Sequence, residues 1–477
     1  MIQPKVGLLP LYLELYDSAL PQARPRINEF LLTIASHLAN KDLEVVVAPV
    51  CRLEDEFAGA VKMFEENEVD AIVTLHLAYS PSLECIKPLA ATKLPIIVLD
   101  TTPTFSFSPE QDPVEVMFNH GIHGVQDMCS MLIRSSKPFQ IEAGHWETSD
   151  VLDRVASWAR AARIAASMRK ARVGRIGESF KGMGDFAVEP DVLYKTIGVE
   201  TVPCDPALLR SMLSGLDDAE VVTEMTSDLV TFVSDGVTNE SHRDSTRMGL
   251  ALRKWIEKEN LSAFTMNFLE FNQESGLLTV PFLEASKAMA RGVGYAGEGD
   301  VLTAALVGAL ASVYPETTFT EMFCPDWESN SIFLSHMGEM NIDLTAEVPV
   351  LMMKPFPWTD AENPVVAVGR LRGGEAALVN LAPGPDDTYT LIVTPITMLD
   401  VEIEDRMGDS VRGWFEPQGD VAGFLEAYSS IGGTHHCALV YGGSFEEIAK
   451  FGELMGWNVV ILEAESGGYD SVSISRN

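Results

Sequence analysis

Cysteine and basic residues are both scarce in this chain. Its six cysteines are scattered among 477 residues and include no C-x-x-C pair: Cys51, Cys85, Cys129, Cys204, Cys324 and Cys437. Scattered cysteines in a large chain are typical of buried, free thiols in a reducing compartment. The 34 Lys and Arg residues are outnumbered by 69 Asp and Glu, which gives a net charge of −35. That balance argues against binding to nucleic acid or to an anionic membrane, because both need a basic surface.

Long apolar runs are absent as well. The longest uncharged, largely apolar stretch is Val301–Val313. It is shorter than the roughly 18 residues that indicate a membrane span, so we expect a buried helix there. The N-terminus has an early lysine, then Gly7–Leu13 interrupted by Pro10 and followed by Glu14, which does not fit a signal peptide. We therefore expect a soluble, cytoplasmic protein.

The chain is too long for a single core, because domains commonly hold about 100–200 residues, and we expect three. Its first third alternates strand and helix signals. Strands are expected at Lys5–Leu9, Leu43–Val50, Asp70–Leu75 and Leu94–Leu99, and helices at Pro25–Ala39, in a stretch ending near Phe64, and at Asp150–Lys170. Strands separated by helices predict a parallel, doubly wound sheet. Ligands of such sheets lie beyond the carboxyl ends of the strands, here near His76 and Asp100.

A second alternating region begins at Arg172–Ile176 and runs to about Tyr314. Beyond it, short strands at Val365–Val368, Ala376–Leu381 and Tyr389–Ile396 are separated by Gly, Pro and Asp turns, which is typical of an antiparallel sheet or barrel. The predicted fold class is therefore α/β. We expect an N-terminal doubly wound parallel-sheet domain (1–170), a second α/β domain (171–314) and a C-terminal, mostly antiparallel, barrel-like β domain (315–477).

One apparent cofactor motif can be set aside. Gly292-Val-Gly-Tyr-Ala-Gly297 matches the dinucleotide pattern G-x-G-x-x-G. That pattern carries its meaning only when a strand precedes it. The preceding Phe282–Arg291 has Ala and Met at helical spacing, so we do not expect a nucleotide cofactor here.

Two acidic segments are candidates for a polar site. Glu298 and Asp300 follow the glycine-rich loop and precede the expected helix; taken alone, this segment is more simply explained as a capped helix start. Glu321 follows further along the chain and is flanked by apolar residues on both sides. A carboxylate in such a setting is often buried, and a buried carboxylate needs a partner or a metal ion.

Three of the nine histidines stand in marked contexts: His336 in Leu334-Ser-His-Met-Gly-Glu, and the pair His435-His436 after Gly432-Gly-Thr. A single histidine in an apolar segment is more often a core residue than a ligand, but an adjacent pair after two glycines is harder to explain in that way. In an extended segment neighbouring side chains point to opposite faces, so one can bind a metal while the other faces a substrate. Two carboxylates and two imidazoles suit Mn²⁺, Fe²⁺, Co²⁺ or Mg²⁺ better than structural zinc.

Six short blocks, in this order along the chain, resemble the L-arabinose isomerase family and, more distantly, the L-fucose isomerases. They are Gly144-His-Trp-Glu, Arg175-Ile-Gly-Glu, Gly294-Tyr-Ala-Gly-Glu-Gly-Asp with Thr303-Ala-Ala-Leu, Phe319-Thr-Glu, Ser335-His-Met-Gly-Glu and Gly432-Gly-Thr-His-His. The resemblance implies the same three-domain fold. It also implies a homo-oligomer, a trimer or hexamer, with the active site between subunits, where Asn119 and His123 would reach into a neighbour's site.

The resemblance further implies a metal-dependent aldose–ketose isomerase acting on a pentose or hexose. The family's metal ligands fall on Glu298, Glu321, His336 and His436, with Mn²⁺ or another divalent ion such as Co²⁺, Fe²⁺ or Mg²⁺ as the cofactor. Glu298 and Glu321 would also carry a proton between C2 and C1 of the sugar through an enediol, while the metal polarises the carbonyl. Positions expected to contact the sugar are His435, Phe268, Phe180, His123 and Asp300.

The pocket wall departs from the family pattern. In the family, an N-terminal segment carries a Gln that contacts the sugar, and in this chain that segment is replaced by Leu9–Tyr16. Three further positions also differ: this chain has Val301 where the family usually has a Trp, Met322 where it usually has an acidic residue, and Phe180 where it usually has a Met. All four ligands are retained, so the reaction type is better supported than the substrate. Two alternatives remain: a metal-dependent epimerase of a sugar or sugar acid, which would form no ketose, and a non-catalytic sugar-binding protein, which predicts the loss of at least one ligand.

Overall fold

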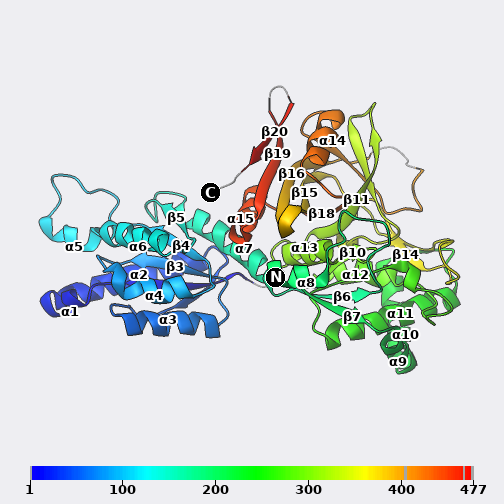
Figure 1. Ribbon diagram of the computed structural model, residues 1–477, viewed down its shortest axis with the longest axis horizontal. Coiled ribbons are helices and arrows are strands. Elements are labelled where there is room, and N and C mark those ends of the chain that lie inside the picture. Colours follow the sequence, from blue (N-terminus) through cyan, green and yellow to red (C-terminus); the bar gives the residue numbers. More distant parts are fainter. Residues whose placement is uncertain (1–2, 402–405, 466–467, 474–477) are drawn as a thin grey trace. The chain divides into compact units, whose positions relative to one another are not determined.

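The computed structural model describes residues 3–401, 406–465 and 468–473 of the chain. These residues form two compact units that divide between Ala166 and Ser167, and Figure 1 shows their elements coloured along the sequence. In the part of the chain that is described, no helix is both long and apolar enough to cross a bilayer. The predicted combination of parallel-sheet α/β domains with a C-terminal antiparallel barrel is confirmed.

The first unit contains the predicted doubly wound sheet. Five parallel strands lie in the order β2-β1-β3-β4-β5, with bounds β1 (Lys5–Leu11), β2 (Glu44–Val47), β3 (Ala71–His76), β4 (Ile96–Asp100) and β5 (Gln140–Ala143). The connecting helices include α2 (Arg24–Ala39), α3 (Glu54–Glu66), α4 (Ser82–Ala91) and α6 (Ile122–Arg134), and α7 (Val151–Arg169) follows the last strand and ends in the second unit. The central strand β3 is buried at every residue, as expected for an apolar strand covered on both faces. The edge strand β5 was not predicted, and β2 is shorter than expected.

The second unit begins with another parallel sheet, in the order β10-β9-β6-β7. Its strands are β6 (Arg172–Ile176), β7 (Glu200–Cys204), β9 (Ala263–Met266) and β10 (Gly294–Gly297), and its helices include α11 (Asn239–Lys258), α12 (Phe282–Ala290) and α13 (Val301–Ala311). Helix α12 comes directly before β10, so the G-x-G-x-x-G pattern lacks the preceding strand, as predicted. Helix α13 is buried along most of its length, also as predicted.

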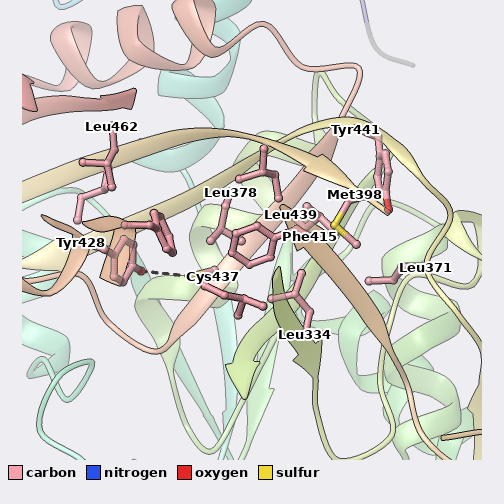
Figure 2. Close-up of a cluster of buried hydrophobic side chains, with 14 of the residues drawn as sticks. Leu334, Leu371, Leu378, Met398, Phe415, Tyr428, Cys437, Leu439, Tyr441 and Leu462 are labelled. Atoms are coloured by element: carbon pink, nitrogen blue, oxygen red, sulfur yellow. Dashed lines mark hydrogen bonds between the residues drawn. The ribbon is translucent and has the colours of Figure 1, made fainter. Parts of the chain in front are cut away.

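The second unit also contains a closed barrel of six antiparallel strands. The strand order is β15-β18-β11-β12-β17-β16, and β16 pairs back with β15 to close it. The bounds are β11 (Thr317–Asp326), β12 (Ser331–Ser335), β15 (Gly374–Pro383), β16 (Tyr389–Met398), β17 (Gly413–Pro417) and β18 (His436–Tyr441), with β19 (Asn458–Glu465) and β20 (Gly468–Ser473) added beside β16. Apolar side chains such as Leu334, Leu378, Phe415 and Leu439 fill its interior (Figure 2).

One predicted strand lies outside the barrel. Val365–Val368 forms β14, which pairs with β13 (Val350–Met353) in a three-stranded sheet completed by β8 (Val233–Asp235). All four residues of β14 are buried. A short, fully buried apolar strand has the same sequence pattern in any sheet, so periodicity does not identify its partners.

The cysteines are free thiols, as predicted for all six. Four of them are buried and Cys129 is partly buried, but Cys324 is exposed on β11. The expectation of burial is therefore wrong at Cys324, because this end of β11 lies in the hairpin that connects it to β12.

Candidate active site

Glu298 is presented by a sharp turn at the carboxyl end of β10. Glu298 and Gly299 both have positive φ, 62° and 83°, and Asp300 then caps α13 by accepting a hydrogen bond from the Thr303 amide at 2.8 Å. A Cβ at residue 299 would lie 2.7 Å from the carbonyl oxygen of Glu178. Glycine is therefore required at this position both for its backbone conformation and for its size.

The barrel register brings the other acidic and histidine side chains together. Glu321 on β11 is paired with His436 on β18 and, on its other side, with Ser335 on β12, which His336 follows directly. Facing residues on antiparallel strands have Cβ atoms about 4.5–5.5 Å apart. Along β18, Cys437 and Leu439 point into the barrel core, so His436 points outward. Helix α13 packs against β11 and β18 and also against β9 and β10, which brings Glu298 to this outer face.

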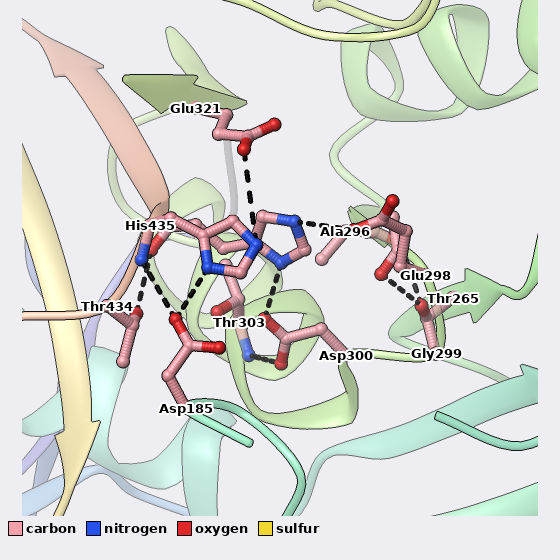
Figure 3. A network of polar contacts seen from close by, with 12 residues as sticks. Asp185, Thr265, Ala296, Glu298, Gly299, Asp300, Thr303, Glu321, Thr434 and His435 are labelled. Carbon is pink, nitrogen blue, oxygen red and sulfur yellow. Dashed lines mark hydrogen bonds and ion pairs between the residues drawn. The ribbon is translucent and has the colours of Figure 1, made fainter. Parts of the chain in front are cut away.

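The four predicted metal ligands meet in this region of the second unit. The Nε2 atom of His436 lies 3.4 Å from Oε2 of Glu298, and Nε2 of His336 lies 3.9 Å from Oε2 of Glu321. The two imidazole rings are 5.9 Å apart. Both rings are buried, and the Glu321 side chain keeps 22% of its exposure. In Figure 3, Glu321 lies above His435 and Glu298 lies to the right of it.

Each buried histidine is held by a carboxylate behind it. Nδ1 of His436 is 2.9 Å from Oδ2 of Asp300, and Nδ1 of His336 is 2.9 Å from Oε2 of Glu339. Glu339 also accepts hydrogen bonds from the Tyr295 hydroxyl at 2.6 Å and from the Gly338 amide at 2.7 Å. A carboxylate that accepts a hydrogen bond from Nδ1–H orients a histidine so that its Nε2 lone pair can bind a metal ion, which is the arrangement that metal-binding histidines use.

The charges of the site shift the pKa values of its members. Burial alone lowers the pKa of His436, but the carboxylates of Asp300 and Glu298 outweigh it and raise that pKa to about 9. Burial likewise lowers the pKa of His336, and the negative charge of Glu339 outweighs it, so that this pKa is also raised. For Glu298, burial raises the pKa, but the neighbouring histidines lower it by a larger amount, so the pKa of Glu298 is lowered overall. The acidic groups thus favour cationic charge at this position.

His435 is the more accessible member of the histidine pair. Its side chain keeps 31% of its exposure, whereas that of His436 is fully buried. Nδ1 of His435 lies 2.5 Å from Oδ2 of Asp185, and its Nε2 lies 4.0 Å from Oε1 of Glu321. Two sets of residues are therefore close enough to hold one cation, Glu321 with His336 and His436, and Glu298 with His435 and His436.

Aromatic rings surround the polar groups. Phe319 contacts both His336 and His436 edge-on, and Phe186 stacks on His436 with 4.8 Å between ring centres. Of the residues predicted to contact sugar, Phe180 and Phe268 lie together, with ring centres 5.6 Å apart. The Phe180 amide also donates a hydrogen bond to the Glu298 carbonyl at 2.8 Å. Asp300, another predicted sugar contact, is fully buried beside His436, and its contact with sugar stays a prediction.

The remaining predicted site residues lie in the first unit. His123 is an exposed residue of α6. Asn119 ends the short helix α5 (Val116–Asn119), where its side-chain oxygen accepts a hydrogen bond from the Thr104 amide at 3.1 Å. Their contribution to the site of a neighbouring copy stays a prediction.

Three residues of the site were not predicted from the sequence. Glu339 stands three positions after His336 within the quoted block Ser335-His-Met-Gly-Glu, so a signal for it was present. Tyr295 lies in another quoted block, but its contact with Glu339 depends on the fold. Asp185 is in a loop far from His435 in sequence and had no signal of its own.

Comparison with known proteins gives a consistent result along the chain. The L-arabinose isomerase N-terminal, central and C-terminal domain families match residues 21–170, 219–314 and 316–458. The L-arabinose isomerase of Geobacillus thermodenitrificans is 26% identical and aligns with 96% of this chain and 93% of its own length. That of Herpetosiphon aurantiacus is 25% identical, over 88% of this chain and 86% of its own.

These matches cover most of the chain in the expected order, at an identity low enough for a divergent member. The chain therefore belongs to the L-arabinose isomerase family, and its enzyme class is that of the aldose–ketose isomerases, which are intramolecular oxidoreductases.

Proposed function

We propose that this enzyme interconverts an aldose and a ketose of five or six carbons, with a divalent metal ion held by Glu298, Glu321, His336 and His436. The main support is the Nε2 atom of His436, which is buried and makes no hydrogen bond with the described residues. A buried polar atom without a hydrogen bond is costly, and a cation held by Nε2 and by the Glu298 carboxylate, 3.4 Å away, would remove that cost. The mixed carboxylate and imidazole set suits Mn²⁺ or a similar ion, which when bound would act as a Lewis acid on the sugar carbonyl.

The two glutamates are assigned the proton transfer. In the forward direction a glutamate carboxylate takes the proton from C2 while O1 gains a proton, which gives an enediol. The proton is then delivered to C1 while the O2 hydroxyl loses its own, so the carbonyl moves from C1 to C2 and the formula is unchanged. Glu298 and Glu321 suit this work because carboxylates positioned beside a substrate can act as the base and the acid of a proton transfer. His435, oriented by Asp185, would bind a sugar hydroxyl beside Glu321.

The family resemblance extends the proposal to assembly and location. We expect a cytoplasmic homo-oligomer, a trimer or hexamer, in which His123 of one copy contacts the sugar bound by another. Light scattering after size-exclusion chromatography measures the mass of the assembly directly.

The proposed reaction is tested by a product screen. Protein loaded with Mn²⁺ is incubated with a panel of aldopentoses and aldohexoses, and products are separated by chromatography and assayed for ketose. We expect ketose from at least one aldose. An epimeric aldose in place of ketose would instead favour the epimerase alternative, and a protein that neither binds Mn²⁺ nor converts any sugar would contradict the proposal.

Glu339→Gln tests the support behind His336. The amide has no charge to favour the Nδ1 proton, so we expect the affinity for Mn²⁺ to fall about 10- to 100-fold, as for other partners behind metal ligands. Titration calorimetry measures the affinity without any need for turnover. Glu347→Gln is the matched control, because Glu347 forms a surface ion pair with Arg370. Unchanged affinity in Glu339→Gln would show that Glu339 does not act through His336.

A further inference from the structure

A cavity of about 370 Å³ opens beside His336, and its wall is almost entirely apolar. Phe282, Phe323, Met337, Phe356, Trp358 and three prolines contribute to it. The wall continues the aromatic residues predicted to contact sugar, because the Phe268 ring lies 6.1 Å from that of Phe356 and 6.5 Å from that of Trp358. Ligand pockets are commonly lined by apolar and aromatic side chains together with a few polar groups, so this cavity could hold the part of a ligand that lies beyond its reacting end.

Lys354 is the one lysine or arginine in this lining. It follows β13 directly and is partly buried, and its side chain makes no hydrogen bond or ion pair with the residues that the structure describes. Burial lowers its pKa, and the negative charges of Glu339 and Asp409 offset only part of that effect. Glu339 is already occupied by His336, Tyr295 and the Gly338 amide. A desolvated ammonium group without a direct partner is unfavourable, in a protein whose acidic residues outnumber basic ones by 69 to 34.

We propose that the substrate is an aldose carrying an anionic group, a carboxylate or a phosphate monoester, at the end remote from its carbonyl, and that Lys354 binds this group. The inference rests on the proposed function, because it requires the reacting end of the sugar to lie at Glu298, Glu321, His336 and His436. The negative surface does not prevent such binding. Exposed charges are screened beyond about 8 Å at physiological salt, whereas a charge contact within a partly buried pocket is screened much less.

The test is a binding measurement with open-chain analogues that cannot isomerise. Galactitol is neutral, and L-galactonate differs from it only by a carboxylate in place of one terminal hydroxymethyl group. D-Arabinitol 5-phosphate carries the phosphate alternative. Each is titrated by calorimetry into the Mn²⁺-loaded wild type, Lys354→Met and Lys354→Arg. Methionine keeps the apolar stem without the charge, and arginine keeps the charge.

We expect at least one anionic analogue to bind the wild type about tenfold or more tightly than galactitol, as for hydrogen bonds to charged groups. Lys354→Met should remove this preference without weakening galactitol binding, and Lys354→Arg should largely keep it. Whichever anion binds more tightly identifies the class, sugar acid or sugar phosphate.

Equal binding of galactitol and both anions, a preference that survives in Lys354→Met, or no binding of any analogue would overturn the inference. These outcomes are separate from a failure of the proposed function, which would appear as absent Mn²⁺ binding and absent ketose in the product screen. When an aldohexuronate and an aldopentose 5-phosphate are added to that screen, ketose from the neutral aldoses alone would keep the proposed function and refute the role of Lys354.

Discussion

Glu298→Gln and Glu321→Gln are each expected to lose at least about 10³-fold in turnover, because each change removes a proton-transfer group from the proposed site. Glutamine is nearly the same size and can still accept a hydrogen bond, but it cannot take a proton from carbon. Neither side chain lies in the barrel core, so folding and assembly should be preserved. The rate of ketose formation on the best aldose of the panel measures the effect, and light scattering and circular dichroism follow assembly and fold.

Glu328→Gln is the matched control for both variants. Glu328 is an exposed glutamate in the hairpin that follows β11, so the same chemical change there should leave the rate close to that of the wild type. Mn²⁺ affinity is measured in all three variants, since Glu298 and Glu321 are proposed to have both roles. Wild-type turnover in either site variant would remove that glutamate from the mechanism.

Much of the fold was predictable because its signals are local. β-Branched and apolar runs separated by amphipathic helices identified the first parallel sheet, and the burial of α13 followed from its uncharged sequence. Local sequence leaves the partners of a strand open. The strand β14 was predicted with its observed bounds and is antiparallel to its neighbour, but its apolar pattern does not show that it pairs with β13 in a sheet outside the barrel.

For the candidate site, the identity of the metal ligands could be predicted from the sequence, but their proximity could not. Glu298, Glu321, His336 and His436 were selected by residue type and family resemblance. The structure brings ligand atoms of Glu321, His336 and His436 within 4.8 Å of one another, and it groups Glu298 with His436 and His435. The reason lies in the strand register, which pairs Glu321 with both His436 and Ser335. The pairing with His436 joins segments more than a hundred residues apart, so no spacing in the sequence reveals it.

The roles of the two carboxylates that contact Nδ1 of the histidines could not be assigned from the sequence either. Asp300 was predicted as a sugar contact, but its observed contacts are to Nδ1 of His436 and to the Thr303 amide. Glu339 belongs to the same sequence block as His336, but no role was predicted for it. Which carboxylate faces a substrate and which supports a ligand depends on side-chain direction, and that is fixed only when α13 packs against β11 and β18.

Removal of the metal ion is expected to abolish turnover reversibly. If Mn²⁺ or a similar ion is held by Glu298, Glu321, His336 and His436, protein treated with EDTA and dialysed should form no ketose, and added Mn²⁺ should restore the rate. His336→Gln and His436→Gln should not recover at the Mn²⁺ concentration that saturates the wild type, because each lacks one of the buried Nε2 atoms of the site.

A stability measurement separates metal binding from catalysis in the same proteins. A ligand that binds only the folded state at about 100 times its dissociation constant stabilises that state by about 2.7 kcal/mol. Mn²⁺ should therefore raise the midpoint of thermal denaturation of the wild type but not that of His436→Gln. His37→Gln is the matched control, because His37 lies on α2 of the first unit, and its midpoint should rise as that of the wild type does. The metal content of the EDTA-treated protein is measured as well. If that content is negligible and turnover is still complete, the acids and histidines isomerise the sugar without a metal ion. An equal thermal shift in His436→Gln would place the bound Mn²⁺ elsewhere on this acidic chain.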